Sequence, residues 1–267
     1  ELRALKVFGA WTNLVDMKAN NTLDTVITEN GKGVVRHYLQ DVGSTFGTGA
    51  LAPHQYDEGW EYVFEGDLLW KRLVTLGFYL QPWQTVPYAN NASIGRFEGA
   101  YFEPERWKPR VPTAAFRHAR NDDNFWAARR VMAFSDEMIR AIAETGRYHD
   151  ESAARLLADI LIQRRDRIAH AYLDAVNPVV DLALTREGAL TFENAAVMAG
   201  VAAEPDQGYI VPWAAFATAT GETQPLGSPT ATRGGQAQAP VALPSSPGAF
   251  VRVQVSAAAP DHPSWAV

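Results

Sequence analysis

The distribution of charged residues divides this chain of 267 residues into two parts near residue 180. Residues 1–180 hold 44 of the 54 Asp, Glu, Lys and Arg residues, whereas residues 181–267 hold 10 of them and nine of the sixteen prolines. Charged stretches with helical apolar spacing favour helices, and Pro- and Gly-rich stretches with short apolar runs favour strands and loops. We therefore expect an α+β protein, mainly helical over 1–180 and β-rich or irregular over 181–267, with a flexible loop at 221–248.

Composition excludes several classes of protein. Hydrophobic residues make up 47% of the chain, which is enough to bury a core. The net charge of −6 argues against a general nucleic-acid binder, and no apolar run approaches the 18 residues of a membrane span. The absence of cysteine excludes disulfides, thiol catalysis and cysteine-bound zinc, but leaves the compartment undetermined.

Local patterns predict the main elements. Apolar spacing predicts a helix over 2–11, and further helices are expected over 66–79, after Ser135 and from Asp150 to about Val176. Two β-leaning runs, 22–29 and 34–40, flank Asn30-Gly31-Lys32-Gly33, so we predict a β-hairpin. Short apolar runs after Pro178 predict strands at 182–184, 189–192, 209–216 and 250–255.

The stretch from Asp16 to Gly43 has the residues that phosphoryl transfer needs. That reaction needs a carboxylate to accept the proton of the attacking hydroxyl, a cation near the transferred group, and oxygen ligands for magnesium. Asp16, Lys18 and Asn21 can supply a base, a cation and an amide oxygen from one loop. The predicted hairpin would bring Asp41 back beside that loop.

Asp16-Met17-Lys18-Ala19-Asn20-Asn21 resembles the Asp-Leu-Lys-Pro-Glu-Asn catalytic loop of protein kinases, and Asp41-Val42-Gly43 is similar to their Asp-Phe-Gly motif. Two further stretches, 41–47 and 125–132, resemble an uncharacterised group of bacterial kinase-like proteins. The resemblance covers most of 1–180 and implies the large lobe of a kinase-like fold, with the predicted hairpin at the active site.

The resemblance also implies roles for individual residues. Asp16 would be the catalytic base and Lys18 would contact the phosphoryl group. Asn21 and Asp41 would hold Mg²⁺, with Asn20 as a rival to Asn21. Gly43 would belong to the site for ATP. The phosphoryl acceptor is not identified by the motifs.

The chain departs from the kinase pattern at several positions. Leu14-Val15 replaces the usual His-Arg, and Val42 replaces Phe. The glycine-rich loop and lysine of a small lobe cannot lie within the first ten residues. We therefore expect a segment of a longer protein, whose missing N-terminal lobe would be a partner of the site, and residues 1–267 alone are expected to bind ATP weakly or not at all.

Two other functions stay open. The first is a non-catalytic kinase-like scaffold or binding protein. The second is a metal-dependent phosphohydrolase that uses Asp16 and Asp41 as a pair.

Weaker signals have ordinary structural interpretations. The six histidines show no zinc-ligand spacing. We expect Gly43–Gly49 to be a mobile loop after Asp41, and Arg164-Arg165-Asp166-Arg167 to be a solvated helix face. The tryptophans are expected mainly as core and loop anchors, with a sugar-binding surface formed by Trp60, Trp83 and Trp107 as an alternative.

Overall fold

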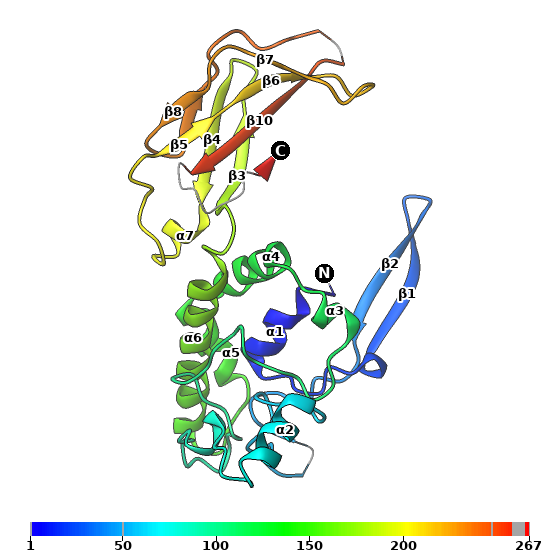
Figure 1. The fold of residues 1–267 in the computed structure, drawn as a ribbon, viewed down its shortest axis with the longest axis vertical. Helices are drawn as coiled ribbons and strands as arrows, with labels where there is room; N and C mark the ends of the chain where they lie inside the picture. The colour runs from blue at the N-terminus through cyan, green and yellow to red at the C-terminus, as the bar shows by residue number, and fades with distance from the viewer. Residues whose placement is uncertain (1, 50, 247, 258–264, 267) are drawn as a thin grey trace. The chain divides into compact units, whose positions relative to one another are not determined.

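The computed structural model describes residues 2–49, 51–246, 248–257 and 265–266, and it mixes helices and strands, which confirms the expected α+β class (Figure 1). The chain forms two compact units, Glu1–Ala171 and Tyr172–Val267. The division falls at the end of the long helix α6 (Glu151–Tyr172), close to the change in composition near residue 180. No helix among the described residues has both the length and the apolar content needed to cross a bilayer.

The first unit is mainly helical. Its α-helices are α1 (Leu5–Thr12), α2 (Gly66–Val74), α3 (Ala114–Arg117), α4 (Asn121–Met132), α5 (Asp136–Glu144) and α6. Two short 3₁₀ helices, η1 (Ala19–Asn21) and η2 (Pro82–Gln84), and one hairpin of strands β1 (Thr22–Glu29) and β2 (Lys32–Leu39) complete it.

Helix α1 packs against α4 in the first unit. Val7 and Ala10 of α1, and Ala127, Ala128 and Val131 of α4, are fully buried. Several of these side chains are small, so the two helices can approach closely and bury a continuous apolar surface. The packing of α1 fixes the position of the loop that leaves its C-terminus.

Local sequence signals set the helix ends. The Ser135 hydroxyl accepts a hydrogen bond from the Met138 backbone N–H at 3.2 Å, so α5 begins as the sequence predicts. Helix α2 is shorter than expected, because Leu76 and Gly77 adopt left-handed backbone angles (φ of 50° and 85°) that do not continue a helix.

The predicted hairpin is present as β1 and β2, paired antiparallel from Thr22 opposite Leu39 to Glu29 opposite Lys32. Asn30 and Gly31 have φ values of 50° and 75°, as a two-residue turn with left-handed central residues requires. The hairpin extends away from the helices of its unit (Figure 1). Val26 and Val35 are 75% and 53% exposed, so their pair is not covered within this unit.

The second unit is mostly β-structure. One sheet has the order β7-β6-β10-β5-β8, with β11 also paired to β10, and a second has the order β3-β4-β9. The strands are β3 (Val179–Leu184), β4 (Ala189–Asn194), β5 (Tyr209–Val211), β6 (Trp213–Phe216), β7 (Thr223–Pro225), β8 (Thr230–Thr232), β9 (Gln236–Gln238), β10 (Phe250–Ala257) and β11 (Trp265–Ala266), and a short helix α7 (Ala195–Met198) follows β4. Leu190, Phe192, Tyr209 and Val211 lie in the core of this unit.

Residues 221–248 differ from the single flexible loop that was expected. Three short strands, β7, β8 and β9, lie in this stretch and pair with β6, β5 and β4 respectively. Each strand has three residues, which is too short for an alternating pattern to appear in the sequence. Backbone hydrogen bonds to β6, β5 and β4 hold these three strands in the sheets.

Two arginines of α6 differ from the expected solvated face, whereas Asp166 and Arg167 of the same stretch are exposed. Arg164 is 3% exposed and Arg165 is 9% exposed. Arg165 donates to the Phe134 carbonyl oxygen at 2.8 Å and lies 2.7 Å from the Asp136 carboxylate. These arginines therefore connect α6 to neighbouring segments, a role that paired and hydrogen-bonded arginine can have in a protein interior.

Candidate functional site

The loop after α1 is held in place by backbone hydrogen bonds on both sides. Helix α1 ends at Thr12, and the next residue, Asn13, turns the chain with a φ of 55°. Val15 then donates its N–H to the Ser44 carbonyl oxygen at 3.3 Å and accepts from the Arg110 N–H at 2.8 Å. Asp16, the next residue, is therefore positioned by two segments that lie far from it in sequence.

The structure brings three of the predicted site residues together. The Lys18 ammonium lies 2.8 Å from an Asp16 carboxylate oxygen, and the Asn21 side-chain amide donates to the Asp16 carbonyl oxygen at 2.9 Å. The Asn21 bond uses its nitrogen and not its amide oxygen. Asn21 is buried whereas Asn20 is exposed, so the ordered amide beside Asp16 is that of Asn21.

The hairpin brings Asp41 and Gly43 back to the same loop. The Gln40 N–H donates to the Asn21 carbonyl oxygen at 2.9 Å, directly before Asp41. One oxygen of the exposed Asp41 carboxylate accepts from the Gly43 N–H at 2.8 Å, which forms a local turn. The Val15–Ser44 bond joins the end of this turn to the Asp16 loop. The two predicted motifs are therefore adjacent through backbone contacts.

The Gly43–Gly49 loop is tied to its surroundings by backbone bonds, in contrast to the mobile loop that was expected. Phe46 donates to the Thr12 carbonyl oxygen at 2.8 Å, and the Gly47 carbonyl oxygen accepts from His54 at 2.8 Å and Arg96 at 3.0 Å. A Cβ on Gly95 would lie 2.0 Å from the Gly47 oxygen, so this contact requires glycine. Backbone hydrogen bonds therefore connect the segment after Asp41 to three other residues of the unit, Thr12, His54 and Arg96.

Three charged or titratable residues near the Asp16 loop were not among the residues that the sequence predicts for the site. They are Glu58, Arg110 and His54. Glu58 lies 3.2 Å from Arg110, the residue whose backbone bonds Val15. Burial raises the pKa of Glu58, and the Asp16 charge adds a smaller contribution in the same direction. His54 contacts Glu58 at 3.6 Å, and its burial lowers its pKa to about 4.

No local signal marked these residues in the sequence. Glu58 and Arg110 lie far from Asp16 along the chain and belong to no short motif with it. Only the packing of the loops around α1 brings them together. Carboxylates with pKa values raised by burial are frequent in functional sites, which adds Glu58 to the candidate residues.

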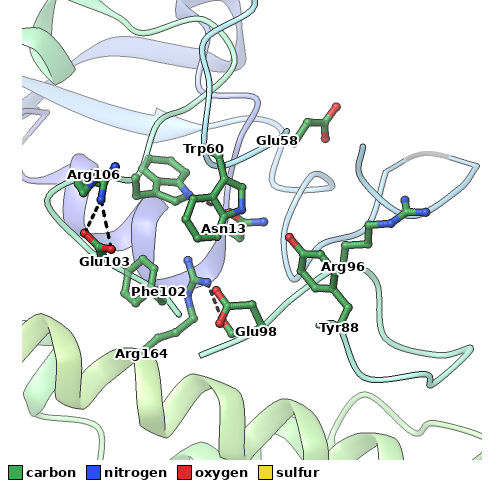
Figure 2. Close-up of a pocket in the computed structure, with 12 residues that line it drawn as sticks. Asn13, Glu58, Trp60, Tyr88, Arg96, Glu98, Phe102, Glu103, Arg106 and Arg164 are labelled. Atoms are coloured by element: carbon green, nitrogen blue, oxygen red, sulfur yellow. Dashed lines mark hydrogen bonds and ion pairs between the residues drawn. The ribbon is translucent and has the colours of Figure 1, made fainter. Parts of the chain in front are cut away.

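A small cavity lies beside Asn13 and Glu58 (Figure 2). Asn13 and Glu58 line it together with aromatic residues and Arg164, and its volume of about 20 Å³ is close to that of one water molecule. The Arg164 guanidinium lies between Phe102 and Glu98 (Figure 2), 3.6 Å from the centre of the Phe102 ring. The cavity is too small for a nucleotide, so any nucleotide would bind outside it.

The three tryptophans considered for a sugar-binding surface do not share one site. Trp107 is 4% exposed and donates its indole N–H to the Asn13 side-chain oxygen at 2.8 Å. Trp60 and Trp107 both line the small cavity, whereas Trp83 lines a different, larger pocket. Trp107 is therefore a core residue, and only Trp83 remains beside a space that could hold a ligand.

Among the residues that the structure describes, no group of three or more His, Asp and Glu side chains is arranged to hold a metal ion by itself. Asn21 and Asp41 could still supply two oxygen ligands to a magnesium ion that takes its others from water and phosphate. Comparison of the chain with protein-family models, curated proteins and solved structures gave no match, so the candidate function rests on the residues of this site.

Proposed function

We propose that the first unit belongs to a kinase-like phosphotransferase that moves the terminal phosphoryl group of Mg-ATP to a hydroxyl acceptor. The observation that carries the proposal is the meeting of two loops. One holds Asp16, Lys18 and Asn21, and the other holds Asp41 and Gly43. This set would supply the carboxylate base, the cation and the oxygen ligands that phosphoryl transfer requires.

Asp16 is the residue proposed to act on the acceptor. Its carboxylate would take the hydroxyl proton while the hydroxyl oxygen forms a bond to the γ-phosphorus. The bond from the γ-phosphorus to the bridging oxygen breaks, and ADP leaves with that electron pair. The partly exposed Asp16 side chain, at 30%, can be reached by an acceptor.

Lys18 is proposed to contact the transferred phosphoryl group. Its ammonium already lies beside Asp16 and its side chain is 41% exposed, so it can turn toward a bound phosphate. A cation at this point would stabilise the negative charge on the phosphoryl oxygens.

Asn21 and Asp41 are the residues proposed to hold Mg²⁺. The amide oxygen of Asn21 is not used in its bond to Asp16, and one Asp41 oxygen is not used in its bond to Gly43. Magnesium commonly keeps several waters and binds one or two carboxylates plus substrate phosphates, so two protein ligands fit it. When bound, the ion neutralises and orients the ATP phosphates.

The test uses the intact protein from the native gene with Mg-ATP labelled in the γ-phosphate. Asp16→Asn should lower phosphoryl transfer by about 10²–10⁴-fold, since it removes a general base. Asp41→Ala should abolish magnesium-dependent nucleotide binding. Asp159→Asn, an exposed acid on α6, serves as the control and should leave transfer unchanged.

The outcomes separate this proposal from its two alternatives. A non-catalytic scaffold would show no ATP turnover and no loss of function on Asp16→Asn. A phosphohydrolase would release phosphate from a phosphoester in the presence of metal without ATP. Unchanged nucleotide binding by Asp41→Ala would show that the role given to Asp41 is wrong.

A further inference from the structure

A second, larger pocket lies near α2 in the first unit. Its volume is about 380 Å³, which falls within the usual range for small-molecule sites. It is formed by the turn before α2, the C-terminal part of α2 with the turn that follows, and η2. The lining residues are Asp57, Glu61, Arg72, Gly77, Tyr79, Trp83 and Gln84.

A buried carboxylate organises this pocket. The Glu61 side chain is 7% exposed and accepts two hydrogen bonds from Arg72, at 2.8 and 2.9 Å. The same carboxylate accepts the Trp83 indole N–H at 2.5 Å. One buried group therefore holds both a guanidinium and an aromatic ring, which pre-organises the pocket wall.

The pocket wall combines acceptors, donors and rings. Asp57 has a side chain that is 37% exposed and offers a carboxylate acceptor. The oxygen of the Gln84 side chain accepts from the Gln81 N–H at 2.6 Å, which leaves its NH₂ group as a donor. Tyr79 and Trp83 add two half-buried aromatic side chains.

This lining selects a chemical class. Hydroxyl groups can both donate to Asp57 and accept from Arg72 and Gln84, and the C–H faces of a ring can pack on the aromatic side chains. An apolar ligand would leave the polar groups without partners. The lining holds two carboxylates, Asp57 and Glu61, and one guanidinium, Arg72, so its net negative charge disfavours an anionic ligand.

Backbone and charge contacts connect the pocket to the Asp16 loop. The Asp57 carboxylate lies 3.6 Å from the Arg110 guanidinium, and the Arg110 N–H donates to the Val15 carbonyl oxygen at 2.8 Å. We infer that this pocket binds a neutral polyhydroxylated ring, a sugar or a cyclitol. The role of that ring as phosphoryl acceptor rests on the proposed function, whereas its binding does not.

The test measures binding without nucleotide. Saturation-transfer NMR with glucose, N-acetylglucosamine and myo-inositol should give signals on ring C–H protons for at least one of them, and titration would give its Kd. Asp57→Ala and Trp83→Phe should each weaken that Kd by about fivefold or more, since the first removes the carboxylate acceptor and the second removes the N–H that the Glu61 carboxylate accepts. Trp70→Ala removes a 64% exposed tryptophan of α2 outside the pocket and should leave the Kd unchanged.

Several results would overturn the inference. These are an absence of signal from all three compounds at millimolar concentration, equal Kd values for the wild type and the pocket variants, or tighter binding of glucose 6-phosphate than of glucose. Ring binding by the wild-type protein without any phosphoryl transfer from Mg-ATP would reject the proposed function alone. Transfer to another acceptor without ring binding would reject the pocket alone.

Discussion

At the scale of single residues, His54 makes the free energy of unfolding depend on pH. Its pKa is lowered from 6.5 to about 4, mainly by burial. Between these values the unfolded chain binds more protons than the folded chain, so stability falls as pH decreases from 6.5 to 4. The folding stability lost through the protonation of His54 is at most about 3 kcal/mol. Glu58, the neighbour whose pKa is raised, contributes in the opposite direction over its own range.

We expect His54→Gln to flatten this part of the pH profile. Urea denaturation at several pH values between 7 and 4 measures the free energy of unfolding for the variant and the wild type. His149→Gln changes an exposed histidine and should keep the wild-type slope. An identical slope in His54→Gln and the wild type would contradict the assignment.

Gly95 is a second single residue that matters for stability, because no larger side chain fits at its position. A methyl group at this position would lie 2.0 Å from the Gly47 carbonyl oxygen, so backbone would have to move. Gly95→Ala should destabilise the first unit by about 1–3 kcal/mol, as overpacking usually does. Gly66→Ala is the matched control, because nothing lies within 4 Å of its Cβ, and it should be neutral or stabilising. Equal melting temperatures for the two variants would refute this prediction.

Arg164 connects three segments of the first unit at the scale of elements. From α6 it donates to the carbonyl oxygen of Ala10 at the end of α1 and to that of Glu98, at 2.8 Å for the latter. Arg164→Lys keeps a charge but cannot reproduce both hydrogen bonds. We expect the free energy of unfolding to fall by about 3 kcal/mol. Arg155→Lys, on an exposed position of α6, should change stability little. Similar denaturation midpoints for both variants would show that the connection contributes nothing.

The elements also show which parts of the fold a sequence can predict. The hairpin and the start of α5 follow from signals within a few residues, Asn30-Gly31 and Ser135, and both are confirmed. Helical spacing could not show that Arg164 is buried, because its partners come from residues 10 and 98. The strands within 221–248 were missed for the same reason, since their pairing partners lie elsewhere in the chain.

The candidate site also contains residues that a local pattern can predict and residues that it cannot. Asp16, Lys18 and Asn21 lie within six residues, so a local pattern could group them, and the hairpin added Asp41. Glu58 and Arg110 reach the site only through tertiary packing. No pattern along the chain records such a contact, which is why they were not predicted.

At the scale of the whole molecule, the two units have separate cores. Leu190 is 2% exposed in the core of the second unit, and Leu190→Ala should destabilise that unit by about 2–5 kcal/mol. Hydrogen exchange followed by mass spectrometry should show faster exchange in β4, β5 and β6. Peptides from α1 and α4 should exchange at the wild-type rate, because both helices belong to the first unit. Equal acceleration in both units would indicate a single cooperative core instead.

The hairpin of β1 and β2 has a consequence for the integrity of the chain. A two-stranded hairpin with exposed faces is only marginally stable by itself, and an exposed turn is a preferred site of proteolytic cleavage. Trypsin could cut after Lys32, directly beyond the Asn30-Gly31 turn. A single cut there would leave Asp16 and Asp41 on separate fragments, joined only by non-covalent contacts such as the bond from Gln40 to Asn21. Protease digestion could thus split the candidate site into two peptides with one cleavage.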